Sequence, residues 1–221
     1  MRAILATALL ALAACAGAPP APEWQPRAHG ALRNYEAAYL GGQSRLAEQE
    51  FARARSALAA TGRADLVARA ELVRCAARVA SLDFDDCPGF GPLAGDASAA
   101  ERAYAAYLAG RAKGGEIALL PEQHRAAAAG DAGALAGIAD PFARLIAAGV
   151  HFRQGRATPA TIGLAIDTAS AQGWRRPLVA WLGIQALRAR EAGDREAAAA
   201  IERRIRLVTG EDAALSRPLP R

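Results

Sequence analysis

The chain lacks the long apolar runs and the strand patterns that define several protein classes. After residue 14 no apolar run approaches the ~20 residues that cross a bilayer as a helix, so no transmembrane helix is expected there. The alternation of apolar and polar residues that is typical of strands is nearly absent as well. Hydrophobic residues nevertheless make up 52% of the 221 residues. A sizeable core is therefore expected, and disorder over most of the chain is excluded.

Lysine is almost missing, because Lys113 is the only lysine among 27 basic residues. The formal net charge is +5, which by itself would fit anionic lipid headgroups or nucleic acid. Aspartate and glutamate are interspersed with the arginines, so we interpret the arginines as part of a solvated helical surface. The N-terminal segment described below predicts export, and nucleic acid is therefore not an expected partner.

Catalytic motifs are also missing. The three histidines, His29, His124 and His151, are isolated in sequence, and none belongs to a His-x-x-x-His pair or accompanies a serine nucleophile elbow. We expect them to have surface or capping roles. Residues 110–115 contain glycines but lack the spacing and the preceding strand of a phosphate-binding loop. No cofactor is expected.

One dense acidic cluster, Asp83-Phe84-Asp85-Asp86, could suggest a calcium loop. Pro88 stands where such a loop requires glycine, and no glutamate occupies its twelfth position. We therefore expect a solvated turn that caps a helix, and no metal site.

The first fifteen residues have the order of a secretory signal: one basic residue, Arg2, an apolar run over residues 3–11, then small residues. Leu12-Ala13-Ala14-Cys15 resembles the lipobox of bacterial lipoproteins. The resemblance implies cleavage before Cys15, diacylation of its sulfur and acylation of the new amino terminus. Because Ala16 follows, where inner-membrane lipoproteins of enteric-type bacteria typically carry Asp, it implies an outer-membrane anchor facing the periplasm.

This order predicts four segments: a signal peptide over 1–14, a lipidated cysteine with a Pro-rich tether over 15–27, a helical domain over 28–209 and a flexible tail over 210–221. Four prolines between residues 16 and 26 favour an extended, polyproline-like tether with a reach of about 30 Å. Trp24 within it is expected either to dock on the domain or to sit at the lipid headgroups, and the sequence leaves both open.

Cys75 and Cys87 remain as an even pair once Cys15 is assigned to the lipid. In an oxidising compartment we expect them to form a disulfide. It would close a loop of about a dozen residues and stabilise the fold by roughly 3 kcal/mol on the chain-entropy model.

Helix-favouring residues dominate the remainder of the chain. Ser98-Ala99-Ala100-Glu101 has the spacing of a capping box, while prolines and glycines make residues 83–95 irregular. The helix over 64–81 is apolar nearly all round, which predicts burial between neighbours. The expected helices cover residues 30–40, 44–60, 64–81, 98–110, 121–129, 141–154, 158–173, 176–192 and 194–208.

An internal echo indicates the architecture. Residues 37–42 recur as residues 105–110, a spacing of 68 that is twice the 34-residue period of tetratricopeptide repeats. The second half of that motif is similar in residue type and spacing to four residues here, Gly42, Ala47, Phe51 and Ala54. Residues 193–198 resemble its inter-helix turn. The resemblance implies an all-α, irregular array of antiparallel helical hairpins, tetratricopeptide-like in kind.

Trp174 and Trp181 lie two helical turns apart, beside Arg175 and Arg176. Two interpretations are open at this point. The tryptophans either pack in the core, or form a partner-binding anchor with the arginines on a concave helical surface.

The favoured hypothesis is a non-enzymatic, lipid-anchored envelope protein that acts as a helical scaffold or assembly factor for other proteins. By resemblance, helical-repeat lipoproteins serve as pilots and assembly factors for secretion, pilus or outer-membrane machinery. One alternative is a cell-envelope enzyme whose acid and base are distant carboxylates such as Glu71 or Glu101. Another is a structural lipoprotein that binds small ligands weakly.

Overall fold

The computed structural model describes residues 22–131 and 133–211, and over these residues the fold is all-α, without a strand. The expected all-α array is thereby confirmed. The lipobox cysteine Cys15 lies outside the described residues, as do the signal peptide, most of the tether and residues 212–221 of the tail. The helices are α2 (Trp24–Leu40), α3 (Ser44–Ala59), α4 (Ala64–Ala80), η2 (Gly91–Leu93), α5 (Ala99–Leu108), α6 (Gly115–Ala118), α7 (Glu122–Ala128), α8 (Ala134–Gly137), α9 (Pro141–Arg153), α10 (Pro159–Ala171), α11 (Arg175–Glu191) and α12 (Arg195–Thr209).

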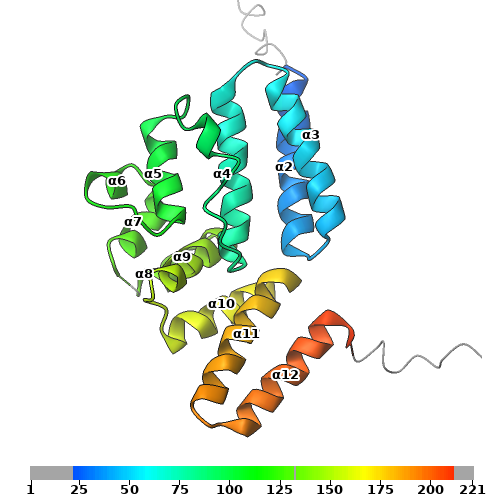
Figure 1. Ribbon diagram of the computed structural model, residues 1–221, viewed down its shortest axis with the longest axis vertical. Coiled ribbons are helices and arrows are strands. Elements are labelled where there is room, and N and C mark those ends of the chain that lie inside the picture. Colours follow the sequence, from blue (N-terminus) through cyan, green and yellow to red (C-terminus); the bar gives the residue numbers. More distant parts are fainter. Residues whose placement is uncertain (1–21, 132, 212–221) are drawn as a thin grey trace, which may run out of the picture.

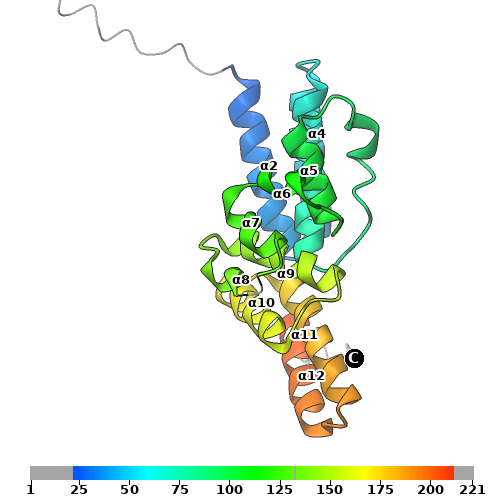
Figure 2. The same cartoon turned by 90° about the vertical axis from the view of Figure 1, so that its left-hand side faces the viewer.

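The helices pack mainly against their neighbours in the chain (Figure 1). Helix α4 lies at the centre, with the α2–α3 hairpin on one side and α5 to α7 on the other. Helices α9 and α10 cross below them, and the α11–α12 hairpin forms the pole farthest from the start of α2. The view turned by 90° shows the same order from pole to pole (Figure 2).

The expected helix boundaries are confirmed to within a few residues, with one correction at the first helix. Helix α2 begins at Trp24, so the last residues of the expected tether are helical. Pro26 is tolerated because the first amides of a helix have no intrahelical acceptor to lose. Trp24 is half-buried and packs against the core formed by α2, α3 and α4, so it docks on the domain.

Local capping explains where several helices start and stop. The Ser98 hydroxyl accepts from the Glu101 amide and the Glu101 carboxylate accepts from the Ser98 amide, which confirms the capping box that opens α5. The two copies of the internal echo both end in a left-handed glycine, Gly42 with φ 83° and Gly110 with φ 73°. Glycine adopts this conformation at no steric cost, so the echo marks the same kind of helix stop.

Helix α4 contributes side chains to two hydrophobic clusters. Leu72, Ala76 and Val79 belong to the larger one, which α5, α7, α9, α10 and α11 complete. Val67 and Ala77 belong to the smaller one, formed with α2 and α3. The expectation that this helix is buried between neighbours is confirmed, and α4 is the wall that both clusters share.

A close helix contact lies where α4 crosses α9. A Cβ atom at Gly149 would stand 2.3 Å from the backbone carbonyl oxygen of Val79. Any larger side chain at this position must push the two helices apart, because a backbone carbonyl cannot rotate away as a side chain can. Nearby, the indole Nε1 of the fully buried Trp181 donates to the carbonyl of Ala80 at 3.2 Å and ties α11 to the end of α4.

Replacing Gly149 by alanine is therefore expected to destabilise the protein by about 2 kcal/mol, despite the higher helix propensity of alanine. Gly163→Ala in α10 is the matched control, because a Cβ there meets nothing within 4 Å. The control is expected to leave the free energy of unfolding unchanged or raise it by up to about 1 kcal/mol. Urea unfolding of both variants checks this, and equal stability of the two would contradict the close crossing.

Candidate functional site

The structure places the predicted tryptophan and arginine anchor at a seam between helices. Trp181 is fully buried and contacts Phe152 edge to face, so the partner-binding interpretation is wrong for this residue. Trp174 is half-buried and packs edge to face on Phe142. Trp174 is the residue before α11 and is extended, so the two tryptophans do not lie on one helical face as their spacing predicted, but both pack against the core.

The two arginines beside Trp174 are engaged in holding helices together. The Arg176 guanidinium lies over the Tyr39 ring at 4.3 Å and donates to the Tyr39 carbonyl and the Ser44 hydroxyl, both at 2.7 Å. Arg175 donates from Nε to the carbonyl of Val208 at 3.1 Å. Arg176 therefore ties the start of α11 to the α2–α3 turn, and Arg175 ties it to the end of α12.

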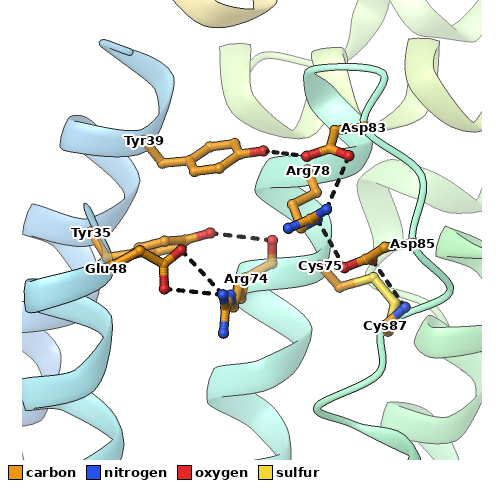
Figure 3. A network of polar contacts seen from close by, with 9 residues as sticks. All are labelled: Tyr35, Tyr39, Glu48, Arg74, Cys75, Arg78, Asp83, Asp85 and Cys87. Atoms are coloured by element: carbon orange, nitrogen blue, oxygen red, sulfur yellow. Dashed lines mark hydrogen bonds and ion pairs between the residues drawn. A yellow bond between two sulfur atoms is a disulfide. The ribbon is translucent and has the colours of Figure 1, made fainter. Parts of the chain in front are cut away.

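Cys75 and Cys87 are joined by a disulfide, with their Cα atoms 5.3 Å apart (Figure 3). The bond links α4 to the irregular segment that follows it. The acidic cluster in this segment is paired with arginines. Arg78 meets both Asp83 and Asp85, at 3.0 and 2.9 Å. Asp86 pairs with Arg153 of α9.

Polar contacts extend this network to α2 and α3 (Figure 3). The Tyr39 hydroxyl donates to Asp83 at 3.2 Å, and the Tyr35 hydroxyl donates to the Arg74 carbonyl at 3.4 Å. Burial, with the charge of Asp83, raises the pKa of Tyr39 to about 12, so its hydroxyl stays a donor at neutral pH. The turn is solvated as expected at Asp83 and Asp86, whose side chains are 48% and 66% exposed, and each carboxylate of the cluster also has a cationic or hydroxyl partner that links the turn to a helix.

The two carboxylates that the enzyme hypothesis singled out do not meet in one cavity. Glu71 is buried against Gly89 and pairs with Arg55 at 3.0 Å, beside the disulfide. Glu101 lies on the wall of a different cleft and pairs with Arg69 at 2.8 Å. Although burial opposes it, hydrogen bonds from Ser98 and the charge of Arg69 leave the pKa of Glu101 below its usual value. Glu101 is therefore a structural carboxylate, anionic at neutral pH.

Two of the three histidines are buried, which corrects the expectation of surface roles. His29 is exposed, but His124 and His151 are almost fully inaccessible. His124 Nδ1 lies 3.2 Å from the Tyr107 hydroxyl, and His151 Nε2 lies 2.9 Å from the carbonyl of Ala127. The apolar residues 145–150 just before His151 were a local signal for its burial, whereas the residues around His124 are mixed in polarity and carried none.

An apolar cleft of about 520 Å³ lies between α4, α5 and the segment that leads into α7. Leu72, Val73 and Ala76 of α4 form its floor. Tyr104 of α5 and Phe142 of α9 supply aromatic walls. Leu119 stands at the rim with 46% of its surface exposed. We call this feature the α4–α5 cleft.

Charged groups lie around the α4–α5 cleft. Arg69 and Glu101 form an ion pair on one side, and Arg125 lies on the other, where its Nε donates to the Leu120 carbonyl at 2.8 Å. Arg125 has no carboxylate partner among the described residues. An apolar floor with a cationic rim suits an apolar group that carries an acidic neighbour.

An aromatic cluster supports the wall of the α4–α5 cleft. The Tyr104 ring lies 6.0 Å from that of Tyr107 and 5.9 Å from that of His124, between centroids. Burial raises the pKa of both tyrosines and lowers the pKa of His124 to about 4. The hydroxyls are therefore protonated and the imidazole neutral at pH 7, so this wall is uncharged.

Sequence reasoning missed the cleft because its parts come from four separate segments. The one available signal was Leu119-Leu120-Pro121, an apolar pair just before a helix start, which follows the short helix α6 that was not expected. Helix α8 was also unexpected. Both are single turns, too short to show a periodic pattern.

Metal-ligating side chains do not cluster among the described residues. Over residues 22–131 and 133–211, no group of three or more His, Cys, Asp or Glu side chains is placed to hold a metal ion. Nor does any helix in the same ranges have the length and hydropathy needed to cross a membrane. Comparisons with protein-family models, with curated proteins and with solved structures found no match to this chain.

Acidification is expected to destabilise the fold through His124. Its pKa of about 4 in the folded protein lies below the value near 6.5 of an exposed histidine. The stability that depends on the neutral imidazole is therefore fully present above pH 6.5 and is lost as the pH falls toward 4. The free energy of unfolding should fall by about 2 kcal/mol between pH 7.5 and pH 5. Urea unfolding at both pH values measures the loss. His124→Gln should shrink the difference between them, and an unchanged difference would show that His124 does not cause it.

Proposed function

We propose that this protein is a lipid-anchored helical scaffold of the cell envelope whose α4–α5 cleft binds an apolar segment of a partner protein. The cleft is the observation that supports the proposal. Leu119 is 46% exposed at its rim, and Val73, Tyr104 and Phe142 on its lining are only partly buried, although a folded domain normally buries such side chains. Apolar clefts of this kind are common sites of peptide docking. The array of hairpins supplies a rigid frame for it.

The shape and charge of the cleft favour a particular occupant. The floor residues of α4 follow one helical face, so an occupant lies along this helix. Its apolar side chains contact the half-buried Val73 and the exposed Leu119. Arg125 at the rim is then available to an acidic side chain beside the apolar ones. We infer a partner segment that combines a short apolar stretch with a flanking carboxylate.

The anchor is the second part of the proposal. By resemblance to lipoproteins, Cys15 would carry the lipid and hold the domain at the outer membrane, on its periplasmic side. Since α2 begins at Trp24, the tether between Cys15 and the domain is shorter than the sequence suggested. At about 3.1 Å per residue it would reach roughly 25 Å.

A second candidate function is the binding of a small apolar ligand. The volume of the cleft lies within the range of about 300–1,000 Å³ that is typical of small-molecule sites. The enzyme hypothesis has less support, because Glu71 and Glu101 lie in separate cavities and each is paired with an arginine.

Leu119→Arg places a charge at the rim of the cleft on a side chain that is already half-exposed, so the fold should tolerate it. We expect co-purification of partners from detergent-solubilised envelopes to fall at least tenfold. Leu46→Arg on α3 is the matched control, because Leu46 is 42% exposed and does not line the cleft. Retention of the same partners by Leu119→Arg, or an equal loss in the control, would contradict docking in the cleft. Loss of a bound apolar dye alone would favour the small-ligand function.

Cys15→Ser removes the only sulfur at the lipobox, so the protein should leave the membrane fraction. Fractionation of envelopes, with the protein followed by immunoblot, measures this directly. Cys87→Ser serves as the control, since it removes a cysteine without touching the lipobox. Membrane retention of the Cys15→Ser variant would rule out the lipid anchor.

A further inference from the structure

The positive charge of the protein is concentrated in one hairpin. Residues 175–210, which form α11 and α12, hold eight arginines against four acidic residues. Residues 22–174 hold sixteen basic and sixteen acidic residues and are neutral as a whole. The excess charge of the described chain therefore lies at the pole that α11 and α12 form (Figure 1).

The arginines of this hairpin differ in how they are used. Arg175 and Arg176 hold α11 in place through backbone carbonyls, and Arg190 pairs with Glu202 across the hairpin. Arg203 and Arg204 on α12 are exposed and make no hydrogen bond or ion pair within the described residues. Their charges are therefore not offset by a neighbouring carboxylate.

An exposed leucine accompanies these free arginines. Leu207 is one turn beyond Arg203 on the same face of α12, and 73% of its surface is exposed, more than that of any other large apolar residue described. The opposite face of the helix carries Ala198 and Ile201, which are buried against α11. The outward face of α12 thus offers cationic groups around an apolar contact, on a helix that its own hairpin already holds rigid.

The position of this face favours an acidic protein segment over a membrane surface as its anionic partner. The described chain begins at one pole, where α2 starts, and the α11–α12 hairpin lies at the other (Figures 1 and 2). If the proposed anchor precedes α2, a short tether holds the first pole near the membrane and the basic hairpin points away from it. This orientation rests on the proposed function, whereas the charge distribution does not.

We propose that the outward face of α12, formed by Arg203, Arg204 and Leu207, is a second docking surface that binds an acidic segment of a partner protein with an apolar residue among its carboxylates. The charge of such a surface speeds association with an acidic partner. Binding weakens as salt is added, because most of the binding energy is electrostatic. Together with the α4–α5 cleft it would give the scaffold two separate contacts.

A binding assay with defined probes tests this surface. The protein is the chain from residue 15 onward with Cys15→Ser, and the probe is a fluorescein-labelled peptide of glutamates interspersed with leucines, followed by anisotropy. Arg203→Glu combined with Arg204→Glu is expected to weaken binding at least tenfold. The matched control is Arg33→Glu with Arg45→Glu, which changes the net charge equally on exposed arginines of α2 and α3 that make no hydrogen bond or ion pair within the described residues. The control should stay within twofold of the parent protein.

Sedimentation with vesicles of phosphatidylglycerol and phosphatidylcholine tests the membrane as the other anionic partner. An equal loss of peptide binding in both double variants would overturn the proposal, because it would show attraction by net charge alone. Vesicle binding that depends on Arg203 and Arg204, without peptide binding, would overturn it in favour of a lipid surface. Leu119→Arg should retain peptide binding, so a failure of the α4–α5 cleft as a docking site is distinguishable from a failure of this surface.

Discussion

The close packing of α4 against its neighbours is the constraint on which the rest of the structure depends. At its C-terminal end the helix packs closely against α9, because Gly149 has no side chain to keep the two backbones apart. The carbonyl of Ala80 at the same end accepts a hydrogen bond from the buried indole of Trp181. Along its length it divides the apolar interior into two clusters, and one of its faces forms the floor of the α4–α5 cleft. The shape of the cleft therefore follows from how this one helix is held.

The segment that follows α4 is held by several independent contacts. Leu82, Asp86 and Cys87 adopt positive φ angles, which are unfavourable for residues with a side chain. The disulfide, the pairing of Arg78 with Asp83 and the contact between Asp86 and Arg153 keep this backbone in place. Because Asp83 also accepts a hydrogen bond from Tyr39 of α2, and Asp86 contacts Arg153 of α9, the segment couples the end of α4 to both sides of the molecule.

The helices of this protein were largely predictable from sequence, because their signals are local. Ser98 with Glu101, Pro141 and Pro159 mark helix starts through backbone groups within one turn. The sites were less predictable, because they depend on which face of a helix its neighbours cover. Trp181 lies within α11 and Trp174 just before it, yet only their packing against α4 and α9 shows that Trp181 is buried and that Trp174 is half-buried.

The burial of His124 was also not predictable from sequence. A single histidine shows no periodic pattern, and His124 of α7 is buried because Tyr104 and Tyr107 of α5, two helices earlier, pack against it. The α4–α5 cleft likewise combines α4, α5, α9 and the residues before α7, which no single window of sequence brings together. Charge was an exception: the basic excess of residues 175–210 is visible in the sequence, but its placement at one pole needed the fold.

Native-state hydrogen exchange tests most directly the claim that α4 joins the two clusters into one cooperative unit. Under mildly denaturing conditions, the slowest amides of α2 and α3 and those of α9 and α11 should open with the same free energy as the slowest amides of α4. Opening of the α2–α3 hairpin at clearly lower free energy, with α4 still protected, would contradict a shared core and would separate the cleft from the helix network proposed to shape it.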